Sequence, residues 1–153
     1  MHRGLATERS TRDLFRRAGL LVEDGINVRM PRSGIVEQID GVVELDGHRY
    51  LLEVRDHHAP LSAEELAWPL LKARSRAGVG LIVVSAGGYT QPAIERCRGA
   101  LRELVVVLVH LDELVALQDP KGELPDLLRT KVRAAELHRD PYWRADGRPG
   151  PGS

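Results

Sequence analysis

The dipeptide Asp46-Gly47 constrains the fold of this chain more than any other feature of its sequence. It separates two runs that are rich in β-forming residues, 35–45 and 48–55, and an Asp-Gly pair in that setting favours a two-residue turn between antiparallel strands. A turn of that length fixes the register, so Glu44 faces Arg49 in a favourable ion pair across the strands. The sequence therefore predicts a β-hairpin with one definite register.

The same register predicts that two carboxylates meet on one side of the sheet. Asp40 then faces Glu53, and Gln38 faces Arg55. Directly opposed carboxylates repel unless something compensates their charge. A divalent cation is the simplest compensator, because two carboxylates from adjacent strands can share Mg²⁺ or Mn²⁺ with its retained waters. The alternative is a structural network in which Arg55 and other arginines neutralise the pair.

The rest of the chain alternates helix and strand signals. Helices are expected over 7–19, 62–76, 90–103, 111–117 and 124–135, with Lys131 at the polar margin of the last one. Strands are expected over 20–30, 79–85 and 105–109, and the last two are unbroken apolar runs typical of central strands. The pattern predicts one α/β domain over residues 1–139, with a central mixed β-sheet flanked by helices. The Gly- and Pro-rich residues 140–153 are expected to form a disordered C-terminal tail.

Composition narrows the function classes. The 22 basic and 22 acidic residues cancel, so no global field draws the chain onto nucleic acid or an anionic membrane. Cys97 is the one cysteine, which excludes an internal disulfide and a thiolate-based zinc site. Neither a signal-peptide stretch nor a run long enough to span a bilayer is present, which predicts a cytoplasmic protein without membrane contact. A homodimer or a partner protein stays open.

The hairpin motif carries a family resemblance. The stretch Glu37-Gln38-Ile39-Asp40, followed by the turn and by Tyr50-Leu51-Leu52-Glu53-Val54-Arg55, resembles the Mrr-like restriction endonuclease subgroup of the PD-(D/E)XK nuclease superfamily. In that family the Asp and the Glu hold a metal ion, and a Lys two residues after the Glu helps to activate the attacking water.

The resemblance implies a restriction-endonuclease-like core and a Mg²⁺- or Mn²⁺-dependent DNA endonuclease of the restriction or phage-defence type. It makes Asp40 and Glu53 the metal ligands and Gln38 a polar residue of the active site. Glu8, on the first helix, becomes a candidate for an additional carboxylate beside the metal, with a solvated Glu at the helix start as the alternative.

This chain departs from the family pattern at one position, because Arg55 stands where the motif has Lys. A guanidinium group stays charged, so Arg55 can stabilise charge in the transition state but cannot act as a base. Lys72 on the following helix could supply the missing ammonium, although the sequence favours an ordinary solvated helix lysine. The competing function is a catalytically degenerate domain that binds nucleic acid or acts as a protein scaffold.

The first expected helix also places three arginines at helical spacing on one face: Arg9, Arg12 and Arg16. Such a face could contact DNA phosphates, which would make the affinity fall with salt. The alternative interpretation is a solvated arginine face.

Overall fold

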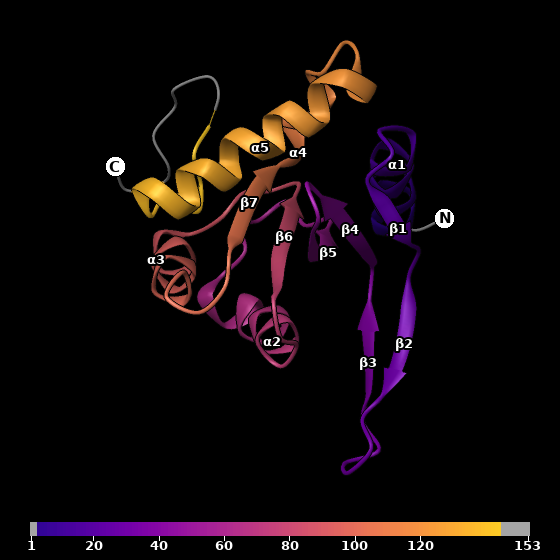
Figure 1. Cartoon of the computed structure of the whole chain (residues 1–153), viewed down its shortest axis with the longest axis vertical. Coiled ribbons are helices and arrows are strands. Elements are labelled where there is room, and N and C mark those ends of the chain that lie inside the picture. The colour runs from indigo at the N-terminus through magenta and orange to yellow at the C-terminus, as the bar shows by residue number, and fades with distance from the viewer. Residues whose placement is uncertain (1–2, 145–153) are drawn as a thin grey trace.

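The computed structural model describes residues 3–144, which form a central five-stranded mixed sheet between two layers of helices (Figure 1). The strand order is β1-β4-β5-β6-β7. The strands are β1 (Leu21–Glu23), β4 (Gly41–Leu45), β5 (His48–Arg55), β6 (Val79–Ser85) and β7 (Val106–His110). Strands β1, β4 and β5 are antiparallel neighbours, whereas β5, β6 and β7 run parallel. The α/β class and the mixed sheet are therefore confirmed.

The helices divide between the two faces of the sheet. The core on one face is closed by α2 (Ala63–Arg74) and α3 (Gln91–Ala100), and the core on the other by α1 (Arg3–Arg17), α4 (Leu111–Val115) and α5 (Pro120–His138). Strand β6 shows why both layers are needed, since Leu81 and Val83 pack into the first core, and Ile82 and Val84 into the second. Its unbroken apolar sequence follows from burial on both faces.

The turn at Asp46-Gly47 has the predicted form. Asp46 and Gly47 have φ values of 52° and 83°, the left-handed conformation that a two-residue hairpin turn requires. The register of β4 with β5 also matches the prediction, from Leu45 opposite His48 to Gly41 opposite Leu52. The pair of Glu44 with Arg49 is part of it, with 3.5 Å between Glu44 Oε2 and Arg49 Nε.

The expected strand over 35–45 is confirmed for Gly41–Leu45 but is wrong for the residues that precede Gly41. Residues 36–39 leave the large sheet as β3 (Val36–Ile39) and pair with β2 (Ile26–Arg29) in a ribbon that projects from the body (Figure 1). Ile39 and Gln38 therefore pair with Ile26 and Asn27 and not with β5. At Gly41 itself a Cβ atom would lie 3.0 Å from the side chain of Leu21, so a glycine leaves space for the packing of β1 beside β4 at this point.

The C-terminal boundary also differs from the expectation. Helix α5 ends at Arg139 in the left-handed conformation (φ 54°), and residues 140–144 then return to the sheet. The Leu108 N–H donates to the Pro141 carbonyl over 2.8 Å, and Tyr142 and Arg144 are buried. The expectation of disorder from residue 140 is therefore wrong for 140–144, whereas 145–153 lie outside the described residues. Within the described part of the chain, none of the helices is long and apolar enough to cross a membrane.

Candidate functional site

Asp40 lies where the ribbon leaves the large sheet, and it is fixed there by a backbone donor. Because the ladder between β4 and β5 stops at Gly41, the buried N–H of Val54 lacks a backbone partner on that side. The Asp40 carboxylate supplies one, with 2.8 Å between Oδ2 and the Val54 nitrogen. The side chain of Asp40 is thereby oriented along β5 before any ligand arrives.

Glu53 is the second carboxylate of the site, and it lies in the interior of the sheet at 2% exposure. Its Oε1 accepts from the Lys72 ammonium, and its Oε2 is 2.9 Å from Arg55 Nη1. Burial raises the pKa of Glu53, the negative charge of Asp40 raises it further, and the two cations lower it. The charge of Asp40 therefore acts on Glu53, although the predicted direct pairing of the two residues is absent, because the ladder between β4 and β5 ends with Gly41 opposite Leu52.

Lys72 contacts the carboxylate oxygen of Glu53 that Arg55 does not contact. The helix that carries it, α2, begins with the predicted capping box of Ser62 and Glu65, and it continues through Pro69. The Lys72 ammonium contacts Glu53 and donates to the carbonyl of Gln38 over 2.6 Å, and the residue is 2% exposed. The interpretation as a solvated lysine is therefore wrong. A signal was present, because Lys72 falls three residues after the buried Pro69, within the apolar stripe of the helix.

Arg55 places one nitrogen among three oxygen atoms. Its Nη1 is 2.9 Å from Glu53 Oε2, 3.2 Å from the carbonyl oxygen of Val54 and 3.7 Å from Asp40 Oδ2. The side chain remains 30% exposed, in contrast to the Lys72 side chain at 3%. The Arg55 guanidinium thus occupies the point where both carboxylates and one carbonyl converge.

Glu8 joins the cluster from α1. Burial raises the pKa of Glu8, the charge of Asp40 raises it further, and its ion pair with Arg12 opposes the rise. The expected arginine face is partly neutralised, since Arg12 and Arg16 both form ion pairs with Asp24. Glu8 therefore interacts with Asp40, which in turn interacts with Glu53.

Gln38 enters the site through its backbone. The β3 strand alternates exposed and buried residues, and the side chain of Gln38 is on the exposed side while its carbonyl accepts from Lys72. The structure therefore offers a backbone oxygen at the position where the resemblance implies a polar side chain.

The donors around Arg55 Nη1 match the chemistry of a hard divalent cation. The described residues contain no group of three or more His, Cys, Asp or Glu side chains that could hold a metal ion. Two carboxylates and the carbonyl of Val54 nevertheless converge there, and such oxygens suit Mg²⁺ or Mn²⁺, ions that often bind few protein ligands and retain waters. The oxygen set of Asp40, Glu53 and Val54 therefore fits the ion that the resemblance implies.

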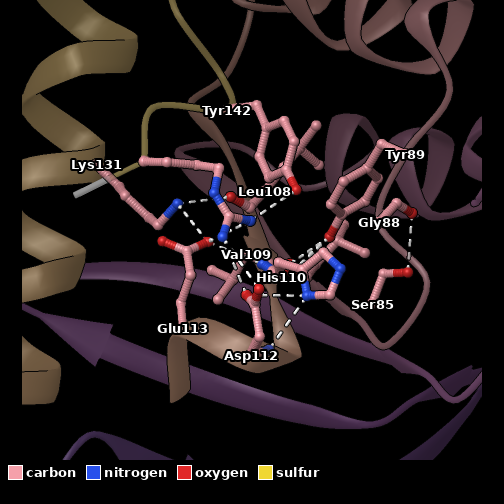
Figure 2. Close-up of polar contacts among 12 residues, drawn as sticks. Ser85, Gly88, Tyr89, Leu108, Val109, His110, Asp112, Glu113, Lys131 and Tyr142 are labelled. Atoms are coloured by element: carbon pink, nitrogen blue, oxygen red, sulfur yellow. Dashed lines mark hydrogen bonds and ion pairs between the residues drawn. The ribbon is translucent and has the colours of Figure 1, made fainter. Parts of the chain in front are cut away.

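A second buried polar cluster lies at the carboxyl end of β7 (Figure 2). Lys131 is 1% exposed there, and its ammonium lies 3.0 Å from the Leu108 carbonyl, 2.5 Å from the Trp143 carbonyl and 3.1 Å from Glu113. Its expected position at the polar margin of the last helix is wrong. The position was not signalled by the helix pattern, because the groups that surround Lys131 come from β7, α4 and the C-terminal segment.

Comparison with known proteins adds information on the fold alone. No family model matches the chain, and no curated protein matches its sequence significantly. Two solved structures are similar in fold. The first is a protein of unknown function, AF1548, at 16% identity and a TM-score of 0.50, covering 80% of this chain and 76% of that one. The second is protein VC1899 from Vibrio cholerae, at 12% identity and a TM-score of 0.52, covering 80% of this chain and 32% of that one.

Proposed function

We propose that this chain is a metal-dependent endodeoxyribonuclease of the PD-(D/E)XK type, in which Lys72 supplies the ammonium that Arg55 has replaced in the motif. One observation carries the proposal: a buried lysine from α2 contacts the buried Glu53, which lies beside Asp40. A carboxylate pair and an ammonium are the three charged groups that the resemblance requires. In this chain the ammonium of Lys72 contacts Glu53 although Lys72 lies on α2, whereas the motif lysine of the family lies on the same strand as the glutamate.

The metal would be held by Asp40, Glu53 and the carbonyl of Val54. Such an ion, when bound, lowers the pKa of a coordinated water and offsets charge on the scissile phosphate. Lys72 fixes the orientation of Glu53, and an ammonium has three N–H donors, of which the contacts with Glu53 and Gln38 use two. The third can donate to the attacking water or to a phosphate oxygen.

Two further side chains have roles in this proposal. Glu8 is a stronger base than an ordinary glutamate, because burial and the charge of Asp40 raise its pKa, so it is suited to accept the proton of the attacking water. Arg55 can stabilise the charge that develops on the phosphate. DNA as the substrate, and restriction or phage defence as the setting, follow from the resemblance of the hairpin to Mrr-like endonucleases.

The test is an incubation of the protein with supercoiled plasmid and Mg²⁺ or Mn²⁺, with EDTA as the control. We expect nicking by the wild type, loss of nicking in Lys72→Met, and wild-type nicking in Lys121→Ala, which removes an exposed lysine from α5. Thermal melting establishes that each variant is folded. A wild type that is inert on plasmid, single-stranded DNA and RNA contradicts the proposal.

The alternative, a degenerate domain that binds nucleic acid without cleaving it, is favoured by a different observation. Arg55 and Lys72 already compensate the charges of Glu53 and Asp40, as in a structural ion network. This alternative predicts that fluorescence anisotropy detects binding of labelled DNA that weakens with salt, while no metal ion supports cleavage.

A further inference from the structure

Three oxygens surround Arg55 Nη1: Glu53 Oε2, the Val54 carbonyl and Asp40 Oδ2, here called the oxygen cage. The three oxygens lie 2.9, 3.2 and 3.7 Å from Arg55 Nη1, and Mg²⁺ binds its oxygen ligands at about 2.1 Å. An ion that binds these oxygens would therefore lie within a few ångströms of the guanidinium charge. Two cations at that distance, in a partly buried site, repel strongly. The metal and the guanidinium group cannot share the cage.

The two cations of the site differ in their freedom to leave it. Lys72 is held between Glu53 and the Gln38 carbonyl, on a helix whose neighbouring residues Leu70 and Ala73 are packed in the core. Arg55 is the last residue of β5, and its side chain is 30% exposed, so part of it already lies in solvent. Arg55 therefore has direct access to solvent, whereas the Lys72 side chain, at 3% exposure, is enclosed by the protein.

We propose that the guanidinium of Arg55 is a built-in, displaceable occupant of the divalent-cation site, and that it weakens metal binding by competing for the oxygens of Asp40, Glu53 and Val54. This inference rests on the metal site of the proposed function. It adds a regulation of that site that motif comparison does not provide: the chain holds its own cation until a sufficient concentration of metal displaces it.

The experiment measures Mn²⁺ affinity by calorimetry and by electron paramagnetic resonance, without DNA. Arg55→Met, which keeps most of the side-chain length without its charge, should bind Mn²⁺ about ten-fold more tightly than the wild type or better. Arg55→Gln provides a second neutral variant if Arg55→Met does not fold. Arg55→Lys, which retains a cation, should stay within a few-fold of the wild type. Arg49→Met removes an exposed arginine from the same strand and should change nothing.

The outcomes separate this inference from the function on which it rests. Addition of Asp40→Asn to Arg55→Met should abolish the tight site, which would place the ion in the cage. If wild type and both neutral variants bind Mn²⁺ equally and all depend on Asp40, the competition is refuted while the metal site survives. If none of the variants binds Mn²⁺, the metal site itself is refuted, and the inference with it.

Discussion

Two lysines in this protein are buried against glutamates, and their surroundings differ. Around Lys131 the burial penalty falls on the lysine, whose pKa is lowered mainly by desolvation. In the pair of Lys72 with Glu53 the burial penalty falls on the glutamate, since burial raises the pKa of Glu53. The first lysine is satisfied by backbone carbonyls and Glu113, whereas the second contacts a glutamate on which the charge of Asp40 also acts. The comparison teaches that burial of a lysine against a glutamate has two different electrostatic outcomes, which depend on whether backbone carbonyls or further carboxylates surround the pair.

The Lys131 cluster is explained by structure alone. Lys131 and Arg144 both lie against the ring of Tyr142, at 5.6 and 5.8 Å from its centroid. Tyr142 in turn packs edge-on against Tyr89 (Figure 2). Glu113 accepts from the N–H of His110 as part of the cap of α4. These contacts fasten the C-terminal segment to the sheet.

The largest expected effect is on stability, at Lys131. Lys131→Met should lower the free energy of unfolding by about 3–5 kcal/mol, since it leaves Glu113 buried with a weaker counter-ion and removes two bonds to carbonyls. Urea denaturation followed by circular dichroism measures the loss. Metal binding per folded molecule should remain that of the wild type. A stable variant with altered metal affinity would break the distinction between the two clusters.

Lys72→Met should have a smaller effect on stability and a complete effect on cleavage. Arg55 remains 2.9 Å from Glu53 in this variant, so the acid keeps a counter-ion, and we expect a loss of about 2 kcal/mol. The same denaturation assay, together with plasmid nicking, checks both parts. If Lys72→Met proves as destabilising as Lys131→Met and leaves nicking intact, Lys72 is a structural lysine like its counterpart.

Two variants of Asp40 should separate its hydrogen bond to the backbone from the effect of its charge. Asp40→Ala leaves the Val54 N–H without an acceptor and should cost about 1–3 kcal/mol, whereas Asp40→Asn keeps an oxygen acceptor and should cost less. Both should lose the metal site. Denaturation curves for the two variants, measured side by side, test the difference, and equal losses would contradict the role assigned to the hydrogen bond.

The smallest effect is a pH dependence of opposite sign at the two clusters. The pKa of Glu53 is raised in the folded state, so its contribution to stability falls as the pH rises from the ordinary glutamate value of about 4.3 to the folded value. The pKa of Lys131 is lowered, so its contribution rises with pH between the folded value and about 10.4. Unfolding free energies of Glu53→Gln and Lys131→Met, compared with the wild type across pH, should show the two slopes. Slopes of the same sign would contradict the assignment.

The sequence predicted what local rules determine. The Asp46-Gly47 turn fixed the partners of β4 and β5, and this register led to Asp40 and Glu53 as neighbours. The prediction failed for residues 36–39, because they pair with β2, and the rules for a two-residue turn do not determine where a strand exchanges one partner for another.

The two lysines were missed for a related reason. The apolar stripe of α2 signals the burial of Lys72. Its partners, Glu53 and the carbonyl of Gln38, which lies 34 residues earlier in the chain, are not contained in any helical pattern. The packing of residues 140–144 was signalled only by Tyr142 and Trp143, whereas the expectation of disorder came from the Gly- and Pro-rich residues that follow them.

The projecting ribbon has a mechanical consequence for the site. Strand β3 ends one residue before Asp40, and its Gln38 carbonyl accepts a hydrogen bond from Lys72. Glu37 of the same strand forms an ion pair with Arg76 over 2.7 Å. The half of the ribbon nearest Asp40 is therefore anchored to the body through the buried side chain of Ile39 and these two contacts with α2. The same contacts hold the backbone that leads into Asp40, so the position of this carboxylate depends on the packing of the ribbon as well as on β5.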